Sequence, residues 1–599
     1  MDVDFDENPF RILVHFFDDL RVVFNRSLDH LEPWQVISYT LAVTFLVQWI
    51  RKVMKIDDAT SVSRSWHNLM MLTTTFYRDR IEEQKQEMQK EIEEKMLRSD
   101  IRREFYKFLP EKGLSVEEII SEATEYKTMG DPLFERGRVS GASFAEDTDD
   151  QKQLMMKVFE LYSHTNANFP DIYPGVRKME SEIIRMLCAL FHGSARACGV
   201  VTTSGTESII LACIAYRNLA AKRGIRKPEI IIGRNADVTL TIAAKLLNLR
   251  TISIPMDQNG QMDLTAIKRS IGLETCMIVC SAPSYISGVM DDIERISELG
   301  LRYNVPVHVD ASLGGFLLPF MEQCDYPAPQ FDFRLSGVTS ISIDLHKYAY
   351  CPIGSSVVLY RDTPMLQAQV IADCYWPGGV FCSPTLSGSR PGSLLALTWA
   401  SLLWNGRLGF VERTQRVLDA AHILRQKLDE SPHVEVIGNP VLASLAFKTK
   451  NPKVNCYVLG DLLNELGWNL AFVQKPEALR FCVSLKQTSP EVINEFMDDL
   501  NRSCERIEKN ADNATVPKML VFYGISSSFT DRGIAEDLPS LFIDTYYSTP
   551  LRQNRSSRTL SIEGRKLSSM QSPSESKLTA LREQFQAGRF SSNLTPHVE

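Results

Sequence analysis

Strand-like runs alternate with helical patterns from about residue 150 to about residue 400, and this alternation constrains the fold more than any other feature of the chain. The runs occupy residues 229–233, 251–255, 277–282, 306–310, 338–343 and 355–360. Such alternation is typical of a doubly wound sheet, whose parallel strands are covered by helices on both faces. We therefore predict an α/β fold with a large, mostly parallel sheet within residues 150–409.

A second, smaller α/β region is expected after residue 410. The segments VEVIG, SLAFKT and LRFCVSL alternate there with helical patterns, which predicts a small C-terminal domain over residues 410–549. From about residue 550 the chain is rich in Ser and Arg, a composition that cannot bury a core. We expect residues 550–599 to form a disordered tail.

Composition narrows the class of function. The 599 residues carry a net charge of -8, which gives no reason to expect nucleic-acid binding. The 12 cysteines show neither a C-x-x-C pair nor the spacing of a metal site. We therefore expect reduced thiols in a cytosolic environment and no bound metal.

An uncharged segment near the N-terminus, WQVISYTLAVTFLVQWI at residues 34–50, has the features of a transmembrane helix. As a helix it would span about 25 Å, close to the thinner hydrocarbon core of the endoplasmic reticulum. Trp34 and Trp49 lie near its ends, where interfacial aromatic residues are common. The alternative is a buried amphipathic helix, because polar residues such as Gln35 and Gln48 interrupt the apolar run.

The charges on the two sides of this segment predict its orientation. Arg51, Lys52 and Lys55 follow it directly, whereas residues 1–33 contain eight acidic residues and three arginines. By the positive-inside rule, the N-terminus is luminal and the rest of the chain cytosolic. The segment would be the signal-anchor of a single-pass protein of the endoplasmic reticulum membrane. A cytosolic stalk and N-terminal segment would follow at residues 51–149, including a highly charged helix at 78–98.

A lysine follows the strand expected at residues 338–343, within the stretch SISIDLHKYAYCPIGSS. Lys347, preceded by His346, stands at the mouth of a buried strand, a position that suits Schiff-base chemistry. An amine there must be desolvated, or lie near another cation, to be a neutral nucleophile. The alternative is an ordinary surface lysine.

Asp310 ends another expected strand, in the stretch VPVHVDASLGGF. An aspartate at the carboxyl end of a parallel strand points into the ligand crevice of an α/β sheet. There it can pair with the protonated ring nitrogen of pyridoxal phosphate, which makes that ring an electron sink. The alternative is that Asp310 caps a helix.

A candidate phosphate site lies in the stretch VVTTSGTES, just before an apolar helical run. Hydroxyl groups and a glycine at a helix N-terminus offer free amides and the positive end of the helix dipole. Ser204, Gly205 and Thr206 can hold a cofactor phosphate there. The same residues also fit an ordinary capping box with Glu207.

With these residues the chain resembles the sphingosine-1-phosphate lyases, which are fold-type I pyridoxal-phosphate enzymes related to the group II decarboxylases. The resemblance runs from about residue 33 to about residue 549 and is carried by HVDASLGGF, DLHKY and SPTLSGSRPG. It implies that Lys347 carries the cofactor, that Asp310 partners the ring nitrogen and that Gly205 lies at the cofactor phosphate. It adds His308 and Asp237 to the candidate cofactor-binding residues.

The reaction that this resemblance implies is a retro-aldol cleavage in sphingolipid catabolism. A phosphorylated sphingoid base would lose a long-chain aldehyde and leave phosphoethanolamine, with Lys347 and His346 as the catalytic residues that move protons. A lipid substrate suits an enzyme anchored in the membrane. Fold-type I enzymes generally build the site at the interface of a homodimer. The Gly/Ser/Pro loop at residues 378–392, which carries Arg390, could be a lid or a dimer loop. Its part from Ser383 to Gly392 is a candidate to cross into the partner's site.

Four positions depart from the family pattern. GRVSGASF ends in Phe144 where the family has Tyr, NANFPDI has Phe169 where the family has His, and Ile353 replaces a Lys. In the family these three positions gather the substrate phosphate, so a phosphate here would lose its donors. The fourth is Asp237, where the family places a His that stacks on the cofactor ring.

The departures leave two alternatives to an active lyase. One is a catalytically impaired paralogue that acts through its dimer surface. The other is a pyridoxal-phosphate enzyme acting on a different amine, such as an amino acid or an unphosphorylated sphingoid base.

Overall fold

The computed structural model describes residues 75–97, 105–129, 131–145, 148–509 and 532–549. The chain divides into two compact units, Met1–Ser99 with Pro110–Tyr547, and Asp100–Leu109 with Ser548–Glu599. In the second unit the described residues, 105–109 and 548–549, belong to no helix or strand. Every element below belongs to the first unit. The predicted luminal segment, transmembrane helix and disordered tail lie outside the described residues.

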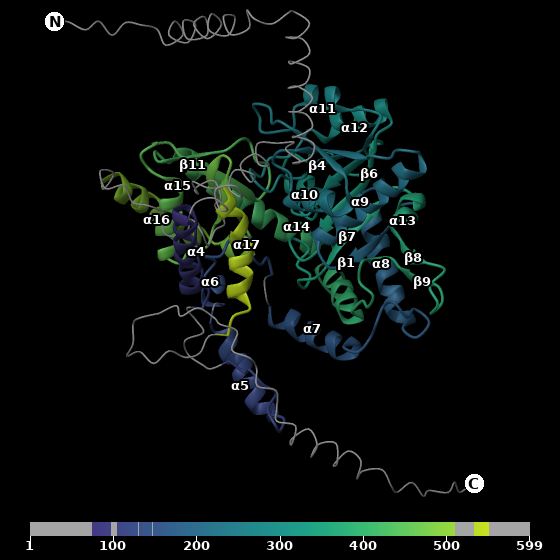
Figure 1. Ribbon diagram of the computed structural model, residues 1–599, viewed down its shortest axis with the longest axis horizontal. Coiled ribbons are helices and arrows are strands. Elements are labelled where there is room, and N and C mark those ends of the chain that lie inside the picture. Colours follow the sequence, from purple (N-terminus) through teal and green to yellow (C-terminus); the bar gives the residue numbers. More distant parts are fainter. Residues whose placement is uncertain (1–74, 98–104, 130, 146–147, 510–531, 550–599) are drawn as a thin grey trace, which may run out of the picture. The chain divides into compact units, whose positions relative to one another are not determined.

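A seven-stranded sheet in the order β1-β7-β6-β5-β4-β2-β3 forms the centre of the first unit (Figure 1). The strands are β1 (Cys198–Thr202), β2 (Glu229–Gly233), β3 (Arg250–Ile254), β4 (Thr275–Ser281), β5 (Val307–Asp310), β6 (Val338–Asp344) and β7 (Ser356–Tyr360). The β2–β3, β2–β4, β4–β5 and β5–β6 pairs are parallel. β7 is antiparallel to both β1 and β6. The predicted large, mostly parallel sheet is therefore confirmed.

All six predicted strands are present, within two residues of the expected bounds, but β1 was missed. Its sequence, CGVVT, has a glycine in the middle, and glycine weakens a strand pattern. The structure explains why a glycine stands at position 199. A Cβ on Gly199 would lie 2.4 Å from the carbonyl oxygen of Val358, so the close pairing of β1 with β7 leaves no space for a side chain.

Alternate residues of the strands face two separate cores, as a doubly wound sheet requires. Ile231 belongs to one core and its neighbours Ile230 and Ile232 belong to the other. The first core is covered by α8 (Pro174–Leu190), α12 (Ile293–Tyr303) and part of α14 (Gly392–Glu430). The second is covered by α9 (Gly205–Lys222) and α10 (Val238–Leu247), with α13 (Thr363–Gln369) packed on α9. The helices α11 (Leu264–Ser270) and η2 (Leu318–Cys324) and the hairpin β8 (Ile371–Asp373) to β9 (Phe381–Ser383) complete this part.

A four-stranded antiparallel sheet, in the order β10-β11-β13-β12, follows α14. Its strands are β10 (Val434–Val436), β11 (Ser444–Thr449), β12 (Ala471–Gln474) and β13 (Glu477–Cys482), and its helices are α15 (Cys456–Glu465), η3 (Leu485–Gln487) and α16 (Pro490–Lys509). The three segments predicted to be strands here correspond to β10, β11 and β13. The expected boundary at residue 410 falls inside α14, just after a kink at Gly406, where φ is 57°.

The charged helix predicted at 78–98 is α4 (Thr75–Met96), and it packs against α17 (Arg532–Tyr546). Met88 and Ile92 of α4 are buried with Leu538 of α17. Lys85 pairs with Asp537 at 2.6 Å. Three further helices, α5 (Val116–Lys127), α6 (Asp131–Glu135) and α7 (Asp149–Tyr162), lie between α4 and the large sheet in the chain. Among the residues described, no helix combines the length and apolar character needed to cross a membrane.

Candidate active site

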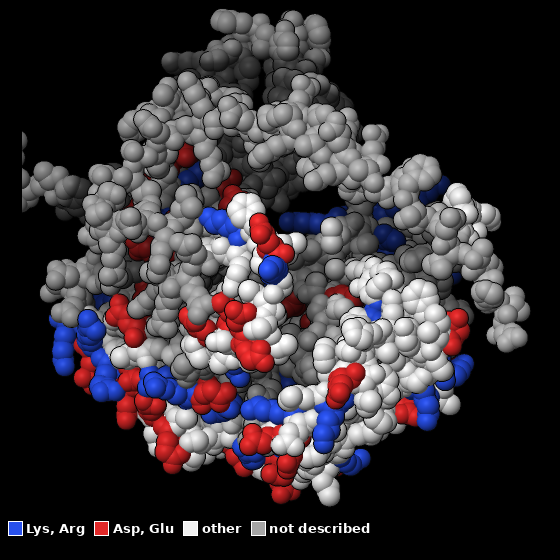
Figure 2. All heavy atoms as spheres, turned by 90° about the horizontal axis from the view of Figure 1, so that it is seen from below, with Lys and Arg blue, Asp and Glu red and all other residues white. Residues whose placement is uncertain are grey.

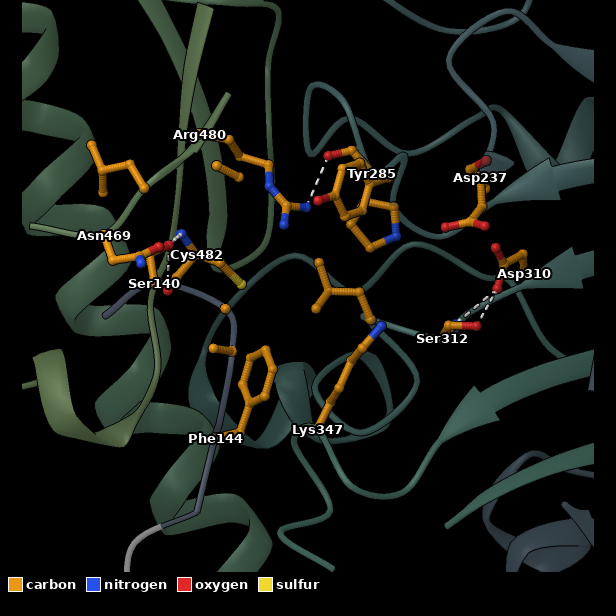
Figure 3. A pocket seen from close by; sticks show the side chains of 17 residues that line it. Ser140, Phe144, Asp237, Tyr285, Asp310, Ser312, Lys347, Asn469, Arg480 and Cys482 are labelled. Atoms are coloured by element: carbon orange, nitrogen blue, oxygen red, sulfur yellow. Dashed lines mark hydrogen bonds between the residues drawn. The ribbon is translucent and has the colours of Figure 1, made fainter. Parts of the chain in front are cut away.

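A pocket of about 230 Å³ lies at the carboxyl ends of β4 and β5 (Figure 3). Three parts of the chain line it: the large sheet, the small sheet and the segment just before residue 145. The main lining side chains are Ser140, Phe144, Asp237, Tyr285, Asp310, Ser312, Lys347, Asn469, Arg480 and Cys482. This is the crevice position that ligands occupy in α/β sheets.

Asp310 is the last residue of β5 and is buried. Its Oδ1 accepts hydrogen bonds from the Ser312 amide and the Ser342 hydroxyl, both at 3.1 Å, and from the Ser312 hydroxyl. Its Oδ2 accepts none from the described part of the chain. Burial, with the nearby negative charge of Asp237 as the second cause, raises the pKa of Asp310 to about 6. The Oδ2 atom of this carboxylate is therefore available to a cation in the pocket, which would stabilise its charge.

His308 supports Asp310 from within the sheet and does not line the pocket. Its Nε2 lies 3.2 Å from the Ser342 hydroxyl, which donates to Asp310, and its Nδ1 lies 2.7 Å from the Ser340 hydroxyl. Burial lowers the pKa of His308 to about 3, so the ring is neutral. Among the described residues, Ser342 links His308 to Asp310.

Lys347 lies in the turn after β6, and its side chain enters the same pocket as Asp310. Burial, the largest single influence, would lower its pKa. The charge of Asp344, 2.9 Å from Nζ, its hydrogen bond to the amine and the charge of Asp310 together raise the net pKa. The expected neutral amine is therefore held here as an ammonium. The other oxygen of Asp344, Oδ1, is buried and finds no hydrogen-bond partner among the residues described.

His346 lies beside Asp344, the carboxylate that pairs with Lys347. Its Nδ1 lies 2.7 Å from the carbonyl oxygen of Ser355, and its Nε2 lies 3.9 Å from Asp344. The ring does not line the pocket. Its catalytic role stays a prediction.

The predicted phosphate site is the start of α9. Ser204 is the N-cap and accepts from the amide of Glu207 at 3.3 Å. Within the described residues, the amides of Gly205 and Thr206 have no acceptor. A Cβ on Gly205 would lie 2.7 Å from Oδ1 of Asp344 and 3.1 Å from the Ser312 hydroxyl. Only glycine therefore lets this helix end approach Asp344 and the lysine turn. The Glu207 carboxylate accepts from the amide and hydroxyl of Thr203, so Ser204 caps the helix without a reciprocal capping box, and the phosphate site stays a prediction.

The four departing positions do not lie together. Phe144 lines the pocket and packs edge-on against Tyr348, with ring centroids 4.8 Å apart. Asp237 also lines the pocket and caps α10 by accepting from the Thr239 amide at 2.8 Å. Phe169 is 49% exposed and Ile353 is 70% exposed, and neither lines the pocket. Within one chain, only Phe144 of the three expected phosphate positions is at the site.

The side chain of Arg390, in the 378–392 loop, makes its polar contacts with other parts of the protein. It pairs with Glu180 and donates to the carbonyl oxygen of Val201 at 3.1 Å. Asn168 donates to Ser387 and Gly388 of the same loop. The loop is thereby tied to the segment before α8 and to β1.

Arg480 was missed. It lies on β13, in the small sheet, yet it lines the pocket with Lys347. The only signal in the sequence was a charged residue inside the apolar run LRFCVSL. A residue more than a hundred positions beyond the lysine can be placed in the site only once the two sheets are folded together.

The pyridoxal-dependent decarboxylase conserved domain matches residues 158–450. Sphingosine-1-phosphate lyase 1 of Rattus norvegicus is 36% identical over 521 residues, which are 86% of this chain and 91% of that protein. The chain belongs to the sphingosine-1-phosphate lyase family.

Two further members of the sphingosine-1-phosphate lyase family agree with this assignment. The lyase of Drosophila melanogaster is 34% identical over 530 residues, covering 88% of this chain and 96% of that protein. The solved structure of the Burkholderia pseudomallei lyase has 33% identity and a TM-score of 0.68, and it covers 74% of this chain and 98% of that chain. The predicted family is confirmed, and it brings pyridoxal phosphate as the cofactor.

The residues of the pocket fit that cofactor. Oδ2 of Asp310 is a free acceptor for a protonated ring nitrogen, and Lys347 supplies an amine in the same pocket. The unpaired amides of Gly205 and Thr206, at the start of α9, suit a phosphate group. The site therefore has the parts that a member of the sphingosine-1-phosphate lyase family needs to bind its cofactor.

Proposed function

We propose that the chain is a lyase that cleaves phosphorylated sphingoid bases to a long-chain aldehyde and phosphoethanolamine. The observation that carries this is the convergence of Lys347 and Asp310 in one pocket of a chain that matches named sphingosine-1-phosphate lyases over most of their length. When bound, pyridoxal phosphate supplies the electron sink for carbon–carbon cleavage.

Residues of the chain itself bind the cofactor and transfer protons. Lys347 binds the cofactor and holds a proton near the reacting carbon, and Asp344 fixes its amine. Asp310 holds the positive charge on the cofactor ring, and the start of α9 binds the phosphate. His346 and Asp237 keep their predicted roles, in proton transfer and beside the cofactor ring.

The test of the function is aldehyde release from sphingosine 1-phosphate by the purified full chain loaded with cofactor. We expect release by the wild type, none by Lys347→Ala, and unchanged release by the surface control Lys448→Ala. A wild type that binds the cofactor and releases no aldehyde would favour the impaired paralogue. That alternative draws support from Phe144, which places a phenyl ring without a hydrogen-bond donor in the pocket.

The proposal includes anchoring in the endoplasmic reticulum membrane by residues 34–50, with residues 1–33 luminal and the catalytic part, with large and small domains at 150–409 and 410–549, cytosolic. Support comes from Arg51, Lys52 and Lys55 after the uncharged segment. Protease protection of a C-terminal tag in intact microsomes tests the topology. A C-terminal tag that is protected from protease would show that the catalytic part is luminal and would contradict the proposed topology.

We also propose a homodimer whose two sites each draw on both chains. Apolar side chains are exposed on α7 (Met156, Phe159 and Leu161) and on the β8–β9 hairpin (Tyr375, Trp376 and Val380). Figure 2 shows a broad uncharged area among the charged side chains of one face. Exposed apolar patches of this kind commonly mark protein interfaces. Light scattering of the full chain in detergent, corrected for bound detergent, should give twice the chain mass.

A further inference from the structure

Arg480 presents two hydrogen-bond donors that the described protein does not use. The side chain is only 6% exposed, and its Nη1 donates to the carbonyl oxygen of Tyr285 at 2.9 Å. Its Nε is buried without a partner. Its Nη2 has no acceptor in the described part of the chain. Nε and Nη2 share one edge of the guanidinium, and this edge is the one that binds carboxylate and phosphate groups through two parallel hydrogen bonds.

The guanidinium is held in place by its surroundings. β13 lies between β11 and β12, so the backbone of Arg480 is paired on both sides. The guanidinium carbon lies 3.8 Å from the centre of the Tyr285 ring. Nη2 faces Gly141, where an added Cβ would be 3.7 Å away. Figure 3 shows the side chain reaching from β13 beside Tyr285, with Lys347 entering the pocket from below. The cation is therefore preorganised, which lowers the cost of ligand binding.

Arg480 also lacks a counter-charge. Across the described ranges, no carboxylate lies within ion-pair distance of it, whereas Lys347, the other cation of the pocket, is paired with Asp344. A buried cation with unpaired donors is costly unless an anion approaches. The opposite wall carries Phe144, which has no donor to offer. Any oxyanion on a bound substrate has Arg480 as its one unpaired charged donor among the described lining residues.

We propose that Arg480 binds the oxyanion of the amine substrate, and so sets the specificity of the site for a charged headgroup. The inference rests on the function proposed above, in which that oxyanion is the phosphate of a sphingoid-base phosphate. A carboxylate would present the same two acceptor oxygens to the same edge. The two sources are separated by the experiment.

The experiment titrates the cofactor-loaded full chain with phosphoethanolamine and with β-alanine, two small primary amines that carry a phosphate and a carboxylate, by isothermal titration calorimetry. We expect the wild type to bind phosphoethanolamine at least about tenfold more tightly than Arg480→Gln, because a charge-assisted pair is lost. Arg480→Lys, which keeps the charge and loses the paired edge, should fall between them. Lys448→Gln removes one charge from neighbouring β11 and should leave binding unchanged.

Kinetics give a second readout. Arg480→Gln should raise KM for sphingosine 1-phosphate by at least about tenfold and change kcat less. Any turnover of unphosphorylated sphingosine should be unaffected. Cofactor absorbance and the melting temperature report whether each variant is folded. If Arg480→Gln does not fold, Arg480→Lys and competition by sulfate against phosphoethanolamine in the wild type carry the test.

The outcomes are distinct. Tighter binding of β-alanine than of phosphoethanolamine, lost in Arg480→Gln, would assign a carboxylate substrate and keep the oxyanion site. Equal binding by wild type and folded Arg480→Gln, or no binding by the wild type, would overturn the proposal. Arg480-dependent phosphoethanolamine binding without any aldehyde release would instead contradict the proposed function and leave the site standing.

Discussion

Nζ of Lys347 lies 2.9 Å from Oδ2 of Asp344, the last residue of β6, three residues earlier in the chain. The carboxylate keeps the amine charged against the effect of burial, and it does so beside the helix end that suits the cofactor phosphate. The resting site thus stores the lysine as an ammonium in a fixed position. Cofactor binding then requires loss of one proton from a held amine, without a search by a mobile side chain.

We predict that borohydride reduction of the cofactor-loaded protein traps the cofactor on Lys347. The reason is the joint placement of Lys347 and Asp310 in one pocket. Mass spectrometry of the digested protein would locate the modified lysine, with Lys347→Ala as the control. Cofactor on another lysine, or on none at saturating pyridoxal phosphate, would refute the assignment.

Asp344→Asn should shift the pH dependence of cofactor capture to lower pH. Burial acts to lower the pKa of Lys347 and Asp344 is the main group that raises it, so removal of this carboxylate lowers that pKa and raises the neutral fraction at a given pH. The measurement is the rate of borohydride-trapped adduct formation by cofactor-free protein across a pH series. Asp373→Asn, on exposed β8, is the matched control. An unchanged profile would mean that Asp344 does not set the state of the amine.

Asp310→Asn should make the stability of the cofactor-free protein rise more steeply with pH, or fall less, between about pH 4 and pH 6 than that of the wild type. Burial, then Asp237, raises the pKa of Asp310 to about 6, above its usual value of 3.8. Between these two values the folded protein retains a proton that the unfolded chain has released, so stability falls as pH rises through this window. The fall attributable to Asp310 is about 3 kcal/mol, and Asn cannot contribute it.

Urea unfolding of the cofactor-free protein from pH 4 to pH 6 measures this effect. Asp237→Asn should recover part of the difference, because it removes only the second cause of the shift. Parallel stability curves for wild type and Asp310→Asn would show that Asp310 is already compensated in the cofactor-free protein.

Phe144→Tyr should raise kcat/KM for sphingosine 1-phosphate roughly tenfold, because it adds a hydroxyl donor to the pocket wall. Adding Phe169→His and Ile353→Lys should raise it further only in the dimer, because both residues are exposed and away from the pocket in a single chain. Asp237→His should add to this effect if stacking on the cofactor is impaired.

Aldehyde release would be compared for these variants and for Phe159→Tyr, which adds the same hydroxyl on exposed α7. If wild type and the triple variant are equally fast, the phosphate does not depend on these positions, and Arg480 alone accounts for headgroup binding.

Ile92→Ala should destabilise the protein by about 2–4 kcal/mol, because Ile92 is fully buried between α4 and α17. Lys90→Ala, on the exposed side of α4, is the control and should change stability by less than about 0.5 kcal/mol. Chemical unfolding measures both. A loss for Ile92→Ala no larger than the control would show that the helix pair contributes little.

The parts of the site that sequence could predict are those set by local pattern. Lys347 and Asp310 each follow a β-branched run, and the carboxyl ends of parallel strands meet at one edge of a sheet. Arg480 could not be found this way, since its place depends on how the small sheet packs beside the large one. The sequence could not predict that β7 runs antiparallel to β6, because a short run of apolar residues fits either direction of pairing.

Of the three expected phosphate positions, only Phe144 lines the pocket of a single chain, and the grouping of all three stays a prediction. Phe144, Phe169 and Ile353 were grouped by resemblance alone, and resemblance does not say which positions share a pocket within one chain. Phe169 and Ile353 are exposed in a single chain, so they could take part in a site only if a second copy of the chain brought them to it.

The pairing of α4 with α17 joins the first and last described helices of the catalytic part. During translation, Met88 and Ile92 leave the ribosome long before Leu538 exists to cover them. Met88 and Ile92 therefore remain without their α17 partner until almost the entire chain has been synthesised. In the nascent chain, α4 is therefore the helix most prone to misassociation and to binding by chaperones. A premature stop codon before α17 would leave Met88 and Ile92 exposed in the finished protein.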